Sequence, residues 1–277
     1  MTPVRAETVD IYNFGALNFR LLKATSDCGQ HASITINAPK GTLVLGGGAF
    51  VDWDGPCSLP SSAGNLLTAM HPNNAGTSWS VEFKDHIIVS RARVIAYCIV
   101  GQMRDGCPIA ESNYQVVHAT SPILAHPATQ ANLAPGFMVV GGGARTESSG
   151  PGSLLFASYP TADLSGWIGR AKDHVESSPG TITVWAIGLK ERFLKEAGML
   201  VRMFSMTTAQ VAHHPRHAFV LPDFHLTGTG ARVNWTGQGN LLTASFPQDR
   251  QTVVVEAKDH IETDKSTITA FAIGFTE

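Results

Sequence analysis

The chain has 277 residues, of which 43% are hydrophobic and 15% charged, a composition that predicts a soluble globular protein and argues against disorder. Its formal net charge of −2, with basic residues scattered along the chain, provides no field to attract nucleic acid. The first ten residues lack the apolar core of a secretory signal, and no apolar stretch is long enough for a membrane-spanning helix. We therefore expect cytoplasmic synthesis without a signal peptide, and leave open release by a non-classical route.

The chain contains three copies of one unit. The tripeptide Lys-Asp-His marks each copy, and the copies lie 88 and 86 residues apart. Thirteen residues after each lysine comes an aromatic residue inside an apolar run. These aromatic residues are Tyr97, Trp185 and Phe271.

Each copy presents the same elements in the same order. A strand-like segment ends in two hydroxyl residues, and a loop histidine follows, at His31, His126 and His213. A glycine cluster comes next, starting at Gly46, Gly141 and Gly228, then a hairpin tip and a Leu-Leu segment. The segments are short, rich in β-branched and aromatic residues, and bounded by turn residues, which predicts five or six strands per copy.

These offsets define the domain organisation. We assign 1–18 to an N-terminal lead-in, 19–101 to repeat 1, 102–113 to a linker, 114–188 to repeat 2, 189–200 to a linker with helical propensity, and 201–277 to repeat 3. The predicted fold is all-β, with three homologous repeats in a pseudo-threefold arrangement. Both a β-prism-like assembly and three small β-sandwich modules fit this pattern.

The glycine clusters differ between copies. Repeat 3 replaces the middle glycine with Thr229 and keeps the outer two. We expect the first and third positions to need a backbone conformation, or a close backbone approach, that a side chain would obstruct.

The strand that ends in Lys-Asp-His has period two. In repeat 1 the aspartate shares a mostly apolar face with Trp79, Val81 and Phe83, so we interpret it as a structural turn former. The lysine and histidine lie on the opposite, outer face, which makes them candidates for ligand binding. These candidates are Lys84, His86, Lys172, His174, Lys258 and His260. If the histidines met on the threefold axis they could bind a metal ion, although duplication alone explains their repetition.

The hairpin tips place a tryptophan beside an acid or an amide in two copies, at Asp52-Trp53 and Asn234-Trp235. Such a pair offers a sugar an apolar plate and hydrogen-bond acceptors. We therefore add these four residues to the candidate ligand-binding set. The alternative is that each tryptophan folds back onto its own hairpin.

No metalloprotease, phosphate-loop, nucleophile-elbow, paired Cys-x-x-Cys or EF-hand motif occurs in the chain. We accordingly assign no catalytic residue, no metal ligand and no cofactor. The four cysteines all fall within the first 107 residues, and Cys98 takes the place of an alanine in the other copies, which predicts a small buried residue.

The pattern of Gly-Gly-Gly-Ala, Lys-Asp-His and Thr-Ile-Thr-x-x-Ala-Ile-Gly resembles a repeat found in tandem in uncharacterised bacterial proteins. This resemblance covers nearly the whole chain and implies no particular activity. At the level of architecture only, the chain is also similar to threefold β lectins, whose sugar-binding motifs it does not match.

These features favour a non-enzymatic, multivalent recognition protein, lectin-like, whose hairpin tips bind a cell-surface glycan or receptor. One alternative is a host-directed toxin, insecticidal or pore-forming for example, or its receptor-binding module. Another is a metal-dependent enzyme that uses the repeated histidines. The sequence leaves the oligomeric state open.

Overall fold

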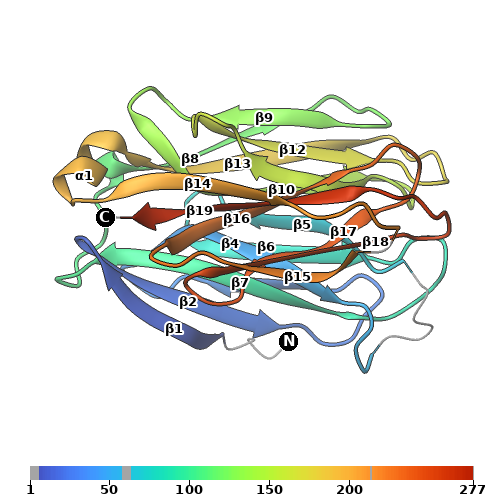
Figure 1. Ribbon diagram of the computed structural model, residues 1–277, viewed down its shortest axis with the longest axis horizontal. Coiled ribbons are helices and arrows are strands. Elements are labelled where there is room, and N and C mark those ends of the chain that lie inside the picture. Colours follow the sequence, from blue (N-terminus) through green and yellow to red (C-terminus); the bar gives the residue numbers. More distant parts are fainter. Residues whose placement is uncertain (1–5, 58–63, 213, 277) are drawn as a thin grey trace.

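The computed structural model describes residues 6–57, 64–212 and 214–276, and its elements are almost all strands (Figure 1). Repeat 1 supplies β2 (Leu17–Thr25), β3 (Ser33–Asn37), β4 (Leu43–Asp52), β5 (Leu66–Pro72), β6 (Ser78–Lys84) and β7 (Arg93–Met103). Repeat 2 supplies β8 (Tyr114–Thr120), β9 (Ala128–Asn132), β10 (Phe137–Ser148), β11 (Leu154–Pro160), β12 (Gly166–Lys172) and β13 (Gly180–Lys190). Repeat 3 supplies β14 (Leu200–Thr207), β15 (His214–Val220), β16 (His225–Asn234), β17 (Leu241–Pro247), β18 (Thr252–Lys258) and β19 (Thr267–Thr276).

The remaining elements lie in the lead-in and the linkers. Strand β1 (Glu7–Phe14) occupies the lead-in, a 3₁₀ turn η1 (Glu111–Asn113) ends the first linker, and a short helix α1 (Glu191–Glu196) lies in the second. No helix among the described residues is long and apolar enough to cross a membrane.

The repeats share their sheets. Each repeat packs two three-stranded halves face to face, and each half continues into a neighbouring repeat through the pairs β4–β17, β5–β10 and β11–β16. The sheet orders are β1-β2-β7-β4-β17-β18-β15, β3-β6-β5-β10-β13-β8 and β14-β19-β16-β11-β12-β9. The predicted all-β, threefold architecture is therefore confirmed. The two arrangements left open by the sequence coexist, because six-stranded sandwiches are joined through three common sheets.

The three repeats meet along a pseudo-threefold axis, where their backbones touch. A Cβ atom on Gly46 would lie 2.2 Å from the carbonyl oxygen of Thr227, and one on Gly141 would lie 2.2 Å from that of Leu45. The first glycine of each cluster is therefore required by close backbone approach, as predicted. Nearer the Lys-Asp-His end, three leucines form a small apolar cluster of their own. They are Leu66, Leu154 and Leu241. Each lies opposite the lysine of its own Lys-Asp-His motif on the adjacent antiparallel strand.

The middle glycine of each cluster is matched to the residue that opens the Lys-Asp-His strand. A Cβ on Gly142 would lie 2.4 Å from the buried indole of Trp167, and Gly47 stands in the same relation to Trp79. Repeat 3 carries Thr229 at the glycine position and the smaller Val253 at the tryptophan position. The two positions have changed together in volume, which explains why only this copy accepts a side chain there.

Strand β1 ties the first repeat to the last. It pairs with β2, while the Tyr12 hydroxyl donates a 2.8 Å hydrogen bond to the carbonyl of Leu226 in repeat 3. The Phe14 ring packs against His225 and Phe275 of the same repeat. Strand β1 therefore adds to the contact between repeats 1 and 3 that the β4–β17 pair already makes.

The four cysteines of the chain all lie in repeat 1 and the linker after it. Cys28 and Cys57 form a disulfide that joins two loops of repeat 1, Cys98 is fully buried as predicted, and Cys107 is exposed.

The match between glycine and tryptophan can be tested in repeat 2. Gly142→Ala should lower the free energy of unfolding by about 3 kcal/mol, because the new methyl group meets the Trp167 indole. In a Trp167→Val background the same alanine should cost at least about 1 kcal/mol less. It should still cost something, since the carbonyl of Trp185 also lies 2.5 Å from the new Cβ. Denaturant unfolding of the four proteins measures this coupling, and additive losses would contradict it.

Candidate functional site at the repeat junctions

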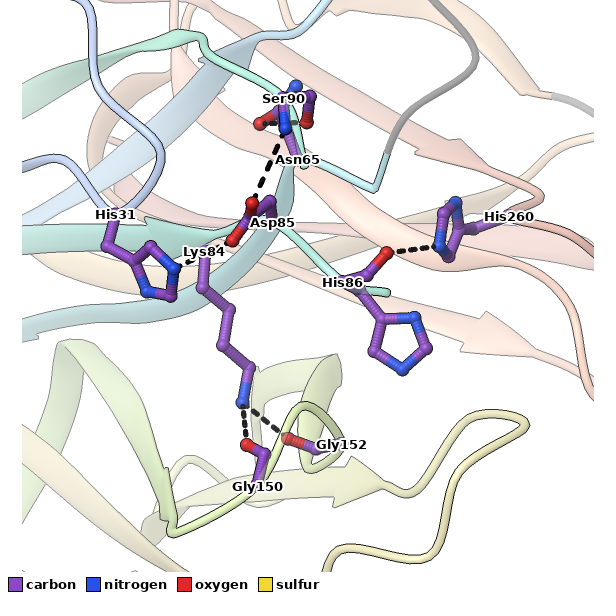
Figure 2. A network of polar contacts seen from close by, with 9 residues as sticks. All are labelled: His31, Asn65, Lys84, Asp85, His86, Ser90, Gly150, Gly152 and His260. Carbon is purple, nitrogen blue, oxygen red and sulfur yellow. Dashed lines mark hydrogen bonds and ion pairs between the residues drawn. The ribbon is translucent and has the colours of Figure 1, made fainter. Parts of the chain in front are cut away.

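The aspartate of each Lys-Asp-His motif fixes the turn that follows it. The backbone N–H of Ser178 donates a 2.9 Å hydrogen bond to Asp173, and Ser90 and Asp264 donate to the corresponding carboxylates at 3.4 Å. In repeat 1, His31 also lies 2.7 Å from Asp85 (Figure 2). The structural role predicted for the aspartate is confirmed.

The residue after each histidine is held in a strained γ-turn. The N–H of Glu176 donates to the carbonyl of His174 across Val175, and the same contact recurs around Ile87 and Ile261. These three β-branched residues have φ angles of 60° to 67°, a conformation that costs about 1–3 kcal/mol. Their side chains are about half exposed, at 47%, 47% and 49%. Three strained turns thus present aliphatic side chains at one end of the molecule.

The histidines of the motif close the axis at this end. The rings of His86, His174 and His260 are buried, with centroids 5.0–5.6 Å apart. His260 Nε2 lies 2.8 Å from the carbonyl oxygen of His86 (Figure 2). His174 Nε2 makes the same contact with the carbonyl oxygen of His260. The prediction that these side chains lie on an outer, ligand-accessible face is wrong, because that face is covered by the next repeat.

The axial rings are not arranged as metal ligands. Nε2 of His174 and of His260 points at a backbone carbonyl and not at a common centre. Within the described residues, no group of three or more His, Cys, Asp or Glu side chains is placed to hold a metal ion.

The lysines of the motif clasp the hairpin tip of the next repeat. Lys84 Nζ donates to the carbonyls of Gly150 and Gly152 at 3.1 and 2.5 Å (Figure 2). It also donates to Ser148 Oγ at 3.2 Å. Lys172 Nζ donates to the carbonyls of Gln238 and Gly239 at 2.7 and 2.8 Å.

Lys258 contacts the hairpin tip of repeat 1, across the third junction, through a tryptophan ring. Its Nζ lies 4.1 Å from the ring centre of Trp53 in repeat 1. Burial lowers the pKa of all three lysines to about 8. The lysines therefore hold the junctions together, and the expectation that they stand free on an outer face is wrong.

Both hairpin-tip tryptophans pack on the neighbouring repeat. Trp53 Nε1 donates a 2.6 Å hydrogen bond to the buried carboxylate of Glu256, and the Trp235 ring lies 3.9 Å under Lys172 Nζ. The alternative that each tryptophan folds back onto its own hairpin is therefore wrong.

The two polar hairpin-tip residues bond within their own repeats. The Asp52 carboxylate pairs with Arg93 at 2.8 Å. The Asn234 amide donates to the hydroxyls of Thr267 and Thr269 at 2.8 and 3.0 Å. Each of them supports its own hairpin.

A pocket of about 310 Å³ opens where repeat 2 meets the tip of repeat 3. Trp235 forms one wall, with the exposed His126 ring edge-on to it at 5.8 Å between ring centres. Val175, Asp173 and Glu176 complete the lining, together with Lys172, Ser177, Gly237 and Gln238. The junction thus brings together a hairpin-tip tryptophan, a Lys-Asp-His motif and a loop histidine, which are far apart in the sequence.

The junction between repeats 1 and 2 has different chemistry. Its cavity, of about 400 Å³, contains Arg145, which pairs with Glu147 at 2.8 Å and Glu82 at 3.5 Å. A serine stands where the other tips carry tryptophan. In the junction between repeats 3 and 1, the predicted loop histidine His213 lies outside the described residues.

Comparison with known proteins identifies no family for the chain. No protein-family model matches it, and no curated protein matches its sequence. Two solved structures align with 98% of this chain and 89% of their own, each at 8% identity and a TM-score of 0.20. One is the atomic structure of Sulfolobus turreted icosahedral virus, and the other describes a triple jelly-roll fold and turret assembly in an archaeal virus. A likeness this low supports no functional argument.

The axial histidines should make the protein sensitive to acid. Burial, followed by the neighbouring His260, His174 and Lys84, lowers the pKa of His86 to about 3. The unfolded chain therefore binds more protons as pH falls from about 6.5 towards 3, and stability falls over that window. The loss is about 1.4 kcal/mol per pH unit for each histidine that stays neutral.

His86→Leu should reduce this acid slope, because it removes a buried ring whose pKa is lowered, and at pH 7 it loses only the contact of that ring with the backbone of His174. Denaturant unfolding at pH 7, 5.5 and 4.5 measures the slope, with the exposed His118→Leu as control. Parallel losses in His86→Leu and the wild type would contradict the assignment.

The γ-turn strain is also testable. Val175→Gly should raise the free energy of unfolding by about 1 kcal/mol, because glycine adopts a positive φ without strain. The matched change Ser177→Gly, at an exposed neighbour without positive φ, should lower it by up to about 1 kcal/mol. Thermal unfolding of both variants decides the point, and a lower melting temperature for Val175→Gly would refute it.

Proposed function

We propose that the protein is a non-enzymatic, multivalent recognition protein that binds carbohydrate at its repeat junctions, with the pocket beside Trp235 as the principal site. The observation that carries this proposal is the composition of that pocket. Trp235 and Val175 supply apolar walls, while His126, Asp173 and Glu176 supply polar groups. A sugar ring has one apolar face and a rim of hydroxyl groups, so it matches walls and polar groups of this kind.

The arrangement of the junctions supports multivalent binding. The three Lys-Asp-His motifs surround one axis, so the two described junction cavities open near the same end of a rigid body. Weak sites held together in this way gain affinity for a repetitive target, such as a cell-surface glycan. The Cys28–Cys57 disulfide is compatible with an oxidising compartment.

One observation favours a second candidate, a host-directed toxin or its receptor-binding module. Several exposed aliphatic residues gather in the loops at the Lys-Asp-His end. They are Ile87, Ile88, Val89, Ile123, Leu124, Val175 and Ile261. Apolar loops on a rigid body are suited to contact a membrane or an apolar receptor surface. Leakage from liposomes at micromolar protein would favour this candidate over glycan recognition.

The glycan proposal predicts binding to an immobilised glycan panel that depends on Trp235 and His126. Trp235→Leu should weaken binding about tenfold or more by removing the aromatic wall, and His126→Ala should weaken it by a smaller factor. The control is His118→Ala, an exposed histidine of the same repeat that does not line this pocket. Thermal unfolding separates loss of binding from loss of fold, since Trp235 also contacts Lys172. Wild-type binding by a Trp235→Leu/His126→Ala double variant would refute the proposal.

A further inference from the structure

The Trp235 pocket contains two carboxylates. Asp173 and Glu176 both line it, and among the described residues neither side chain has a salt-bridge partner within 4.0 Å. Glu176 is exposed, so its carboxylate is available to a ligand. The Oδ1 atom of Asp173 is buried and lacks a hydrogen-bond partner within the described residues.

The one cation that lines the pocket does not neutralise these carboxylates. Lys172 Nζ is committed to the carbonyls of Gln238 and Gly239 and to the face of Trp235. Its side chain is fully buried, whereas Glu176 faces solvent. A ligand therefore meets carboxylates beside an aromatic wall, and not the ammonium group.

The first junction differs from this pocket in its charge distribution, whereas the third copy keeps the two acidic positions. In the first junction Asp85 is paired with His31, and Ile88 stands at the position of Glu176. The charged groups there, Arg145, Glu82 and Glu147, pair with one another. In the third copy Glu262 takes the position of Glu176, and it supplies a matched control.

We infer that the Trp235 pocket selects a carbohydrate that carries a protonated amine, such as a 2-amino sugar, over a neutral or an acidic sugar. This inference rests on the proposed function and adds the class of sugar. The ammonium group would lie against the exposed Glu176, close to the charge of Asp173, while the apolar face of the ring packs against Trp235. Charge-assisted hydrogen bonds to carboxylates are roughly twice as strong as neutral ones. An acidic sugar would instead be repelled by the same two carboxylates.

The test compares sugars that share a backbone and differ in charge. A short β-1,4-linked glucosamine oligomer, its N-acetylated form and an oligogalacturonate are titrated into the full chain by calorimetry at low salt. We expect the amine oligomer to bind about tenfold more tightly than the acetylated one, and the acidic oligomer to show no binding. The preference should fall at high salt and at a pH where the amine is neutral.

The variants assign the preference to the pocket. Glu176→Gln keeps the shape of the side chain and removes its charge, so it should abolish most of the amine preference while still binding the acetylated oligomer. Glu262→Gln, the matched change in repeat 3, should leave the preference at the Trp235 pocket unchanged. Equal affinity of the wild type for the amine and acetylated oligomers, or a preference that survives Glu176→Gln, would overturn this inference alone. Absence of binding to every sugar on a broad panel would overturn the proposed function itself.

Discussion

The architecture depends on the contact between three backbones at the axis. The glycines Gly46, Gly141 and Gly228 allow the carbonyl of one repeat to approach the Cα of the next more closely than any side chain would permit. This contact sets the distance between repeats, and so lets β4, β10 and β16 each pair with a strand of a neighbour. A sheet that continues across a repeat boundary needs no separate edge there, so the three inter-repeat pairs cover six strand edges that isolated sandwiches would expose.

Once the repeats are that close, the outer face of each Lys-Asp-His strand lies against the next hairpin tip. A buried ammonium group is costly unless it is fully hydrogen-bonded, and carbonyls of the tip supply the partners of Lys84 and Lys172. The lysine thereby fixes where the tip lies. The pocket beside Trp235 is a consequence, because its two halves belong to different repeats and exist as a site only when the lysine clasp has formed.

Period-two patterns and matching offsets were sufficient to predict the triplication, the strands and the role of the aspartate, because these depend on local chemistry. The burial of His86 and Lys172 could not be predicted, since alternation tells which residues share a face and not what covers that face. His126 was visible as a repeated loop residue, yet nothing local relates it to Trp235, 109 positions further along the chain. The sequence did carry a signal of one spatial contact. Repeat 3 has Thr229 and Val253 at two positions that are in contact, as glycine and tryptophan, in the other repeats.

Comparison of the three repeats indicates which hairpin-tip residues the junctions need for folding. Lys84 obtains its hydrogen bonds from Ser148 and two glycine carbonyls, without any aromatic partner. Lys172 likewise has two carbonyl acceptors, so the ring of Trp235 is not needed to satisfy it. The contact between the lysine and the hairpin tip therefore does not require a tryptophan. The strained turn at Val175 also costs free energy that a glycine would not. Both residues line the same pocket, and a ligand that uses both walls gives one physical reason for retaining them.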